Sequence, residues 1–313
     1  MILVNNMNLI ESFDKNLIVE KEPDKIIETI ISKLYFYGDE VYKVYKYEKF
    51  FFGDFSSFNF RAKFYKEDFL WNKIMAPVVH LELKEVENDF YIKMKKFDDS
   101  KNFTNLLLQK NISDNDLKKV VLEMVVRLDK ITKIKKNDPD YDFNQKLVDI
   151  HLSDLESDAN LLYLIGDFIS KEKVDEITNI SKKVSLNTSY FKDYDPNNFS
   201  ILIDNHADNI VFLDNVVEFV DVLPPKESWR VGDINFIISR MAVDVAVLFD
   251  EEKSKIIYDT FEKNNAIPAE IRAIYQIRSA LIQMWCFYSQ KKPDIAKKYL
   301  EFAESRVKYL QGI

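Results

Sequence analysis

The period of the hydrophobic pattern changes near residue 100, and this change limits the chain to a fold with two unlike parts. Apolar and polar residues alternate in KLYFYGDEVYKVYKY (33–47) and in PVVHLELKEVENDFYIKMKKF (77–97), as they do in strands with one buried face. From Leu117 to Ile131, apolar residues instead recur every three or four positions, as in a long helix against a core. The sequence therefore predicts an α+β fold with an antiparallel sheet first and a mainly helical part second.

Turn and cap residues divide the first part into elements. Gly38-Asp39 predicts a hairpin between two strands, and Glu87-Asn88-Asp89 predicts a turn between two later strands. Ser56 or Ser57 can cap a helix between these strand pairs. Ile26 to Leu34 have the spacing of a further helix. We expect a small antiparallel sheet with one main helix across it.

The second part has the signals of a helical lobe. Ser113 or Asn115 can cap the long helix, and Pro268 and Pro293 stand where the last two helices begin. A short hairpin around Asp214-Asn215 interrupts the helices. The two predicted domains are a lobe of residues 1–97 and a lobe of residues 98–313.

Composition excludes several classes of protein. The chain of 313 residues has only 5 glycines, so a phosphate-binding loop of clustered glycines is excluded. A net charge of −8 argues against a nucleic-acid partner. The single cysteine, Cys286, can form neither an intrachain disulfide nor a cysteine zinc cluster, and its apolar surroundings predict an inert thiol. No run approaches the ~20 apolar residues of a membrane span, so we expect a cytoplasmic protein with no membrane partner; the oligomeric state stays open.

A dense group of polar residues lies in LIDNHADNIVF (202–212). Asp204 and Asn209 stand five residues apart, and Asp221 follows after the short hairpin. Kinases have the same order of a catalytic aspartate, an asparagine for Mg²⁺ and a second aspartate for Mg²⁺. Carboxylate and amide oxygens suit Mg²⁺, and an aspartate without metal can accept a proton from a hydroxyl. A polar turn is the simpler alternative, whereas a calcium loop is excluded because its sixth position is Asn209 rather than glycine.

The same template requires a lysine on the third strand and an acid on the next helix. Lys43 follows the predicted hairpin, although Lys46 and Lys49 are near and one surface lysine in a run is the alternative. Glu67 and Asp68 both lie on the predicted helix, and the sequence leaves open which of them pairs with Lys43.

Four segments resemble a known superfamily. They are GDEVYKVYKYEKFFFGDFS (38–56), LWNKIMAP (70–77), MKKF (94–97) and LIDNHADNI (202–210). In order, they resemble the patterns GD-x-A-Y-K-L-K-K-P with F-G-F-L-D-[FY]-S, L-N-R-R-L-A-P, M-R-R-F and H-G-D-L-H-x-x-N-I. These patterns are typical of the aminoglycoside phosphotransferase/choline kinase-like superfamily, and within it of a bacterial family often fused to a P-loop ATPase domain.

The resemblance implies a bilobal protein kinase-like fold and a phosphotransferase that uses ATP and Mg²⁺. Asp204 would be catalytic, Lys43 would hold the nucleotide phosphates, with Glu67 or Asp68 as its partner, and Asn209 and Asp221 would bind Mg²⁺. The hinge backbone at Met94, Lys95 and Lys96 would face adenine. The acceptor would be a hydroxyl of a small molecule, which is cationic in antibiotic-modifying relatives.

Two segments depart from the family pattern. Leu202-Ile203 replace the His-Gly before the catalytic aspartate, and the nucleotide loop FYGDEV (36–41) keeps only Gly38. A kinase-like module that binds nucleotide or a partner without turnover is therefore a second hypothesis. Phosphorylation of a protein is a third, which the absence of an A-P-E activation-segment signature disfavours.

Overall fold

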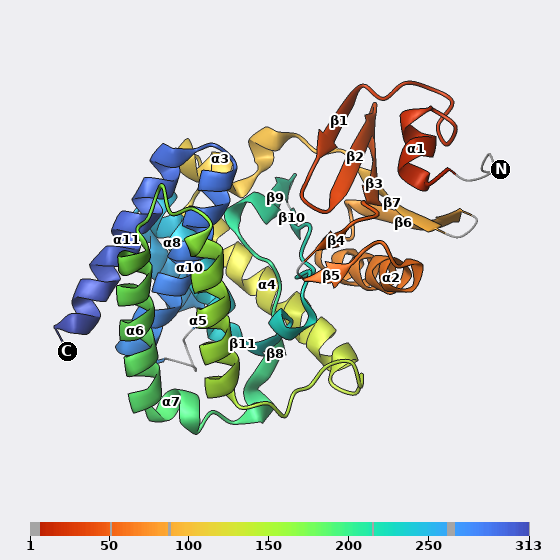
Figure 1. Cartoon of the computed structure of the whole chain (residues 1–313). Coiled ribbons are helices and arrows are strands. Elements are labelled where there is room, and N and C mark those ends of the chain that lie inside the picture. The colour runs from red at the N-terminus through yellow and green to blue at the C-terminus, as the bar shows by residue number, and fades with distance from the viewer. Residues whose placement is uncertain (1–6, 51, 87–88, 215, 262–266, 313) are drawn as a thin grey trace. The chain divides into compact units, whose positions relative to one another are not determined.

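The computed structural model describes residues 7–50, 52–86, 89–214, 216–261 and 267–312 (Figure 1). The chain forms two compact units: residues up to Phe103 together with Asn209–Trp229, and Thr104–Asp208 together with the residues from Arg230 onward. The predicted α+β class is confirmed, with the main sheet in the first unit and most helices in the second. The predicted lobes, 1–97 and 98–313, stay a prediction.

The first unit contains a five-stranded antiparallel sheet. Its strands, in spatial order, are β1 (Lys25–Glu28), β2 (Ser32–Tyr37), β3 (Glu40–Tyr45), β7 (Asp89–Lys95) and β6 (His80–Val86). The hairpin at Gly38 is confirmed, and a φ of 61° explains the glycine there. Two of the three residues of the predicted turn at 87–89 lie outside the described residues.

The predicted helix from Ile26 to Leu34 is wrong. These residues form β1 and the start of β2, which pair with each other across a short turn at residues 29–31. Four of the five apolar residues in this segment are isoleucines, whose β-branched side chains favour strands. In the sheet, the backbone N–H and C=O groups of these residues form hydrogen bonds to the neighbouring strands instead of the bonds that they would form within a helix.

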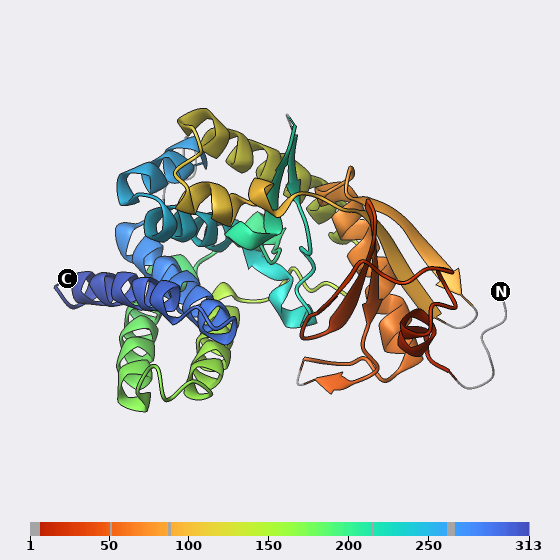
Figure 2. The same ribbon diagram turned by 90° about the horizontal axis from the view of Figure 1, so that it is seen from above.

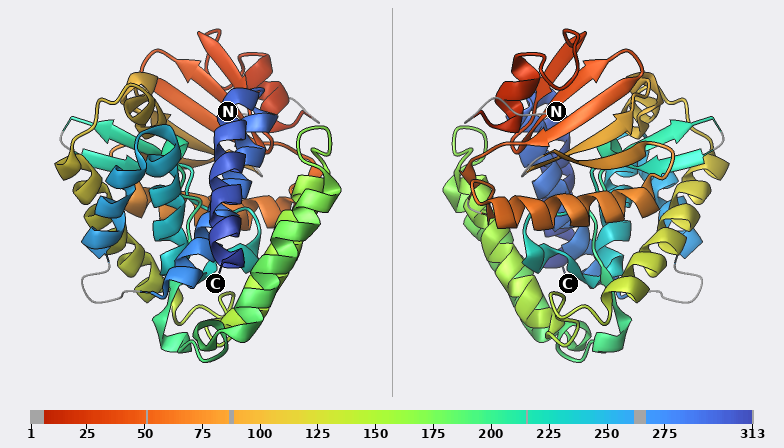
Figure 3. Two further views of the ribbon diagram at one scale, coloured as in Figure 1. Left: turned by 90° about the vertical axis from the view of Figure 1, so that its left-hand side faces the viewer. Right: turned by 90° about the vertical axis from the view of Figure 1, so that its right-hand side faces the viewer.

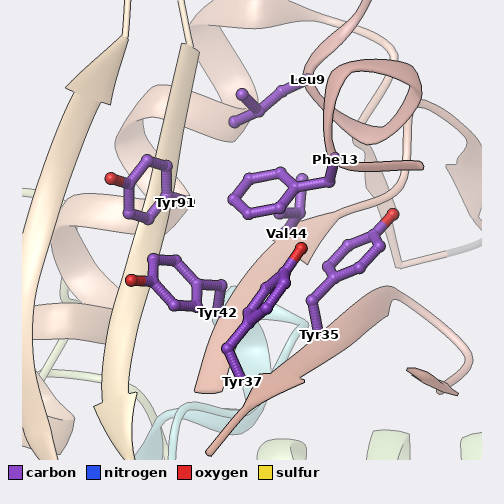
Figure 4. Close-up of a cluster of buried hydrophobic side chains, with 7 residues drawn as sticks. All are labelled: Leu9, Phe13, Tyr35, Tyr37, Tyr42, Val44 and Tyr91. Atoms are coloured by element: carbon purple, nitrogen blue, oxygen red, sulfur yellow. The ribbon is translucent and has the colours of Figure 1, made fainter. Parts of the chain in front are cut away.

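One helix covers each face of the sheet. The long helix α2 (Phe58–Met75) begins after Ser57 and lies on the face that carries Lys43 and Tyr45. The short helix α1 (Leu9–Asp14) covers the other face, where Phe13 stacks on Tyr35 with ring centroids 4.8 Å apart (Figure 4). The buried hydrophobic cluster between α1 and this face of the sheet consists of Leu9, Phe13, Tyr35, Tyr37, Tyr42, Val44 and Tyr91. The core of this unit therefore lies on both sides of the sheet.

Two small hairpins complete the first unit. The strands β9 (Ile210–Leu213) and β10 (Val216–Phe219) form a separate two-stranded ribbon, seen in Figure 2. The strands β4 (Lys49–Phe50) and β5 (Gly53–Asp54) form another. The first unit consists of two chain segments, and a 3₁₀ turn lies near the end of each: Asp99–Lys101 in the first and Glu227–Trp229 in the second.

The second unit is mainly helical. Its helices are α3 (Phe103–Leu108, whose first residue belongs to the first unit), α4 (Asp114–Lys135), α5 (Leu147–Tyr163), α6 (Lys171–Asn187), α7 (Ser189–Lys192), α8 (Ile234–Leu248), α9 (Glu251–Phe261), α10 (Ala269–Ser289) and α11 (Pro293–Gln311). Ser113 and Asp116 form a reciprocal capping box at the start of α4. The predicted starts near Pro268 and Pro293 are confirmed. The helices α5 and α6 run side by side in Figure 1, and each view of Figure 3 has one of them in front of the other. No helix among the described residues is long and apolar enough to cross a membrane.

A short antiparallel pair in the second unit leads into the polar segment of the sequence. It consists of β8 (Phe199–Ile201), which follows a 3₁₀ turn at Pro196–Asn198, and β11 (Val231–Asp233). Gly232 lies where an added Cβ would be 2.9 Å from Leu202 Cδ1, so a larger residue on this strand would have to displace the Leu202 side chain. The polar loop 202–208 follows β8, and a 3₁₀ turn at Ala207–Asn209 leads from it to β9.

His151 is an unusual core residue of the second unit. Its ring is buried on α5 and stacks on Phe191 with centroids 4.3 Å apart. Neither ring nitrogen has a hydrogen-bond partner among the described residues. Burial, together with the positive charge of Arg278, holds the pKa of His151 well below its usual value of 6.5. The folded protein therefore keeps this imidazole neutral.

This burial predicts a pH-dependent loss of stability. Below about pH 6.5 the unfolded chain binds a proton at His151 that the folded protein does not, so the free energy of unfolding falls as the pH falls. His151→Phe keeps an aromatic ring and removes the titration. Between pH 7 and pH 5, we expect wild type to lose up to about 2 kcal/mol more stability than the variant, measured by denaturant unfolding. Equal losses in both proteins would contradict this expectation.

Candidate functional site

Lys43 is the centre of a cluster of charged side chains in the first unit. Its Nζ donates to Asp221 Oδ1 at 2.6 Å and to Asp68 Oδ2 at 3.2 Å. The lysine is 4% exposed and Asp68 is 1% exposed. Burial by itself would lower the pKa of Lys43, but the two carboxylates outweigh this effect and raise the pKa above its ordinary value. The lysine therefore stays charged inside the unit.

The structure distinguishes the two candidate acids on α2. Asp68 pairs with Lys43 and also accepts hydrogen bonds from Tyr45 Oη (2.5 Å) and Asn72 Nδ2 (2.7 Å). Glu67, one residue and about 100° around the helix, accepts a hydrogen bond from Trp71 Nε1 at 2.9 Å. Burial raises the pKa of Asp68, and the charge of Lys43 opposes this rise. Asp68 is thus the acid that the fold turns toward the lysine.

The β9–β10 hairpin brings together the two predicted metal ligands. Asn209 precedes β9 and Asp221 follows β10, and Asn209 Nδ2 donates to the Asp221 carbonyl at 3.3 Å. Asp221 has a φ of 52°, a left-handed conformation that aspartate tolerates better than most residues. An amide and a carboxylate oxygen are hard ligands that suit Mg²⁺ when phosphate oxygens and water complete the shell. The donor set therefore fits this ion.

The three predicted hinge residues lie at the end of β7. Met94 pairs with Val41 of β3, while the N–H groups of Lys95 and Lys96 donate to the carbonyls of Val79 and Asp39, both at 2.8 Å. A purine bound here would therefore contact carbonyl oxygens of these residues or the backbone that follows. Apolar side chains surround the segment: Met94, Phe97 and Leu213 pack against Ala76, Val79, Val211 and Val220.

The sheet register identifies a turn near Lys43 that the sequence analysis missed. Lys43 stands opposite Leu34, two residues from Ser32, where the turn at 29–31 ends. Gly38 is five residues from Lys43. At about 3.4 Å per residue, Ile31, the nearest residue of the turn at 29–31, is about 10 Å away along the strands, and Gly38 is about 17 Å away. Gly38 N–H also donates to Asp24. The loop next to the lysine is thus Thr29-Ile30-Ile31, which contains no glycine.

The polar loop of the second unit is held by one face of α8. Arg240 Nη2 donates to Asp204 Oδ1 at 2.7 Å, and Asn205 Nδ2 donates to the Ile237 carbonyl at 3.1 Å. The N–H of Ala207 donates to Asp244 Oδ2 at 2.7 Å. The three positions on α8 are spaced i, i+3 and i+7, so they form one stripe of the helix.

Asp244 anchors this arrangement in the core. It is fully buried and also accepts hydrogen bonds from Gln283 Nε2 (2.9 Å) and Tyr299 Oη (2.7 Å). Burial raises the pKa of Asp244, and these donors oppose the rise. Leu202 and Ile203, which stand at the His-Gly positions of the family pattern, are 7% and 1% exposed. The loop is therefore fixed by apolar side chains on one side and by Asp244 on the other.

The thiol of Cys286 is not a reactive nucleophile. It is partly buried on α10, and burial, together with the negative charge of Asp204, raises its pKa to about 12. A thiol with such a pKa carries very little thiolate at neutral pH. This environment agrees with the prediction of an inert thiol.

Comparison with known proteins identifies the fold. No protein-family model matches the sequence, and no curated protein is significantly similar to it. Among solved structures, a thermostable mutant of aminoglycoside phosphotransferase APH(4)-Ia matches with a TM-score of 0.55 and 12% identity, over 95% of this chain and 99% of that one. The GDP complex of wild-type aminoglycoside 2′-phosphotransferase-IIIa matches with a TM-score of 0.54 and 10% identity, over 96% and 98%.

A third structure of the same kind is a GDP and kanamycin complex of a 2″-aminoglycoside phosphotransferase, with a TM-score of 0.54 and 10% identity, over 95% of this chain and 97% of that one. The protein thus has the bilobal, kinase-like fold of the aminoglycoside phosphotransferases, as the sequence predicted.

Proposed function

We propose that the protein is a phosphotransferase that uses ATP and Mg²⁺ to phosphorylate a hydroxyl group of a small molecule. The observation that carries this proposal is the cluster in which buried Lys43 contacts both Asp68 and Asp221, with Asn209 beside Asp221. In protein kinases the same residue types serve as the lysine that contacts the phosphates, its acidic partner on the helix and two ligands of Mg²⁺. The likeness in fold to known phosphotransferases supports the same proposal.

Each side chain has a defined task in this proposal. Lys43 binds the phosphates, and Asp68 keeps Lys43 charged and oriented. Asn209 and Asp221 would hold Mg²⁺, which would neutralise charge on the phosphates. Asp204 orients the acceptor hydroxyl and accepts its proton as the hydroxyl oxygen attacks the γ-phosphorus. The bond to the β-phosphate oxygen breaks, ADP leaves, and Asp204 releases the proton to water.

The nucleotide would lie against the first unit. In this proposal the turn at 29–31 covers the phosphates, and the backbone at Met94, Lys95 and Lys96 and the residues that follow faces the base. Glu67 supports α2 through Trp71 and does not contact the phosphates. The apolar residues around Met94 would supply contacts to the purine ring.

For the phosphoryl acceptor we propose a chemical class and not a single compound. Kanamycin in a structure of similar fold makes a cationic compound with several hydroxyls the first acceptor to test. Two acids on α5, Asp154 and Asp158, pair with Arg278, and their side chains are only 14% and 15% exposed, so little of either carboxylate is accessible to such a cation. A cytoplasmic location and the relation to the ATPase-fused family remain parts of the proposal.

A second candidate is a nucleotide-binding protein without turnover. The observation that favours it is the turn Thr29-Ile30-Ile31, where side chains stand in place of glycines that would let the backbone approach phosphate. Ile30 is 60% exposed at this turn.

Measurement of ADP formation separates the two candidates. The purified chain is incubated with Mg²⁺ and either ATP or GTP, with and without a panel of aminoglycosides, amino alcohols and sugars. A phosphotransferase forms ADP or GDP faster with one acceptor than without, and mass spectrometry finds that acceptor heavier by one phosphoryl group. Nucleotide binding with no diphosphate formed for any acceptor would instead support the second candidate.

A further inference from the structure

We propose that Arg240 is a positioning residue for phosphoryl transfer, and that it fixes the carboxylate of Asp204 in the orientation that accepts the proton of the acceptor. This inference rests on the proposed function and assigns a role to a residue that no kinase motif in the sequence includes.

The geometry within the second unit supports this role. Arg240 Nη2 lies 2.7 Å from Asp204 Oδ1, a short charge-assisted hydrogen bond. The side chain of Arg240 is only 10% exposed, so the guanidinium has little freedom, whereas that of Asp204 is 38% exposed and accessible to a ligand. One carboxylate oxygen is therefore held from the core side while the carboxylate stays open to solvent.

The rest of the loop makes this anchor effective. Asn205 and Ala207, on either side of His206, are both bonded to α8, at the Ile237 carbonyl and at Asp244. The backbone around Asp204 is thus fixed without the His-Gly of the family pattern. The bond from Arg240 acts directly on the Asp204 carboxylate and so constrains its side-chain torsions.

Stability alone does not account for a buried arginine at this position. Arg240 Nε is buried and has no hydrogen-bond partner among the described residues. A buried ion pair often contributes little net stability compared with an apolar side chain of similar size, and an unsatisfied buried donor adds a cost. A methionine would fill much of the same space against Phe236, whose ring lies 6.0 Å from the guanidinium carbon. The arginine is better explained by its effect on Asp204.

The first test compares Arg240→Met with wild type in the ADP assay. We expect kcat to fall roughly 100-fold, as expected when a reacting group is misplaced, while the KM for nucleotide and the melting temperature change little. Lys253→Met is the matched control, because it breaks an exposed ion pair with Asp114 in the same unit. An unchanged kcat in Arg240→Met would overturn the proposal, and so would a parallel loss of kcat, nucleotide affinity and melting temperature.

Chemical rescue supplies a second readout. Arg240→Ala leaves a space for a guanidinium ion, so added guanidinium at concentrations well below denaturing should restore part of kcat in this variant but not in Asp204→Asn. Absence of rescue, together with full activity of Arg240→Met, would assign Arg240 a purely structural role. Wild type is measured in the same assay, and no turnover by wild type with any acceptor would refute the proposed function itself.

Discussion

Asp204→Asn is expected to lower kcat by about 10²- to 10⁴-fold and to leave the Kd of Mg²⁺-ATP unchanged. The amide has the shape of the carboxylate and can still accept the hydrogen bond from Arg240. It cannot accept the proton of the attacking hydroxyl. Nucleotide binding should persist because Lys43, Asn209 and Asp221 belong to the other compact unit of the chain.

This expectation is checked by two measurements on the same preparation. The ADP assay gives kcat, and titration calorimetry with a non-hydrolysable ATP analogue gives the Kd. A variant that turns over like wild type would refute the catalytic role of Asp204. A variant that loses nucleotide affinity along with kcat would show that Asp204 acts in binding.

Lys43→Met should destabilise the protein and abolish nucleotide binding. Removal of the lysine leaves the Asp68 carboxylate buried without its counter-ion, which typically costs about 3–5 kcal/mol. Lys46→Met is the matched control, because Lys46 pairs with Glu28, whose side chain is 59% exposed, and we expect a loss below about 1 kcal/mol.

A double variant separates stability from function. Lys43→Met with Asp68→Asn removes both buried charges, and the new amide oxygen can still accept the hydrogen bond from Tyr45. We expect the double variant to recover most of the lost free energy of unfolding but not the affinity for ATP. If it regained ATP affinity as well, Lys43 would have no direct role in nucleotide binding.

Local patterns in the sequence predicted much of the fold. The helix α4 and the hairpin at Gly38 follow from hydrophobic period and turn residues, which depend on near neighbours in the chain. The helix predicted from Ile26 to Leu34 is wrong because the five apolar residues of this segment fit a helical spacing by chance. The cross-strand pairing that decided their conformation is not visible in a single segment.

The candidate site was predictable only where its residues follow a known order. Lys43, Asp204, Asn209 and Asp221 stand in the sequence order of the kinase template. The choice of Asp68 over Glu67 required the rotation of α2 about its axis.

The anchors of the polar loop could not be predicted. Arg240 is 36 residues from Asp204, and Asp244 is 37 residues from Ala207. Only the packing of α8 against the loop reveals their contacts. The turn at 29–31 was missed for a related reason, because its position depends on the sheet register.

Thermal unfolding with and without Mg²⁺-ATP is the most direct test of whether the first unit binds Mg²⁺-ATP through Asp221. A ligand at about 100 times its Kd stabilises the folded protein by about 2.7 kcal/mol. We predict an increase in melting temperature for wild type that requires Mg²⁺ and is lost in Asp221→Ala but kept in Glu85→Ala, an exposed acid on β6. The positive φ of Asp221 lowers the baseline stability of its variant, so the shift on adding ligand is compared. No Mg²⁺-dependent shift in wild type, or an equal shift in Asp221→Ala, would show that the first unit does not bind Mg²⁺-ATP through Asp221.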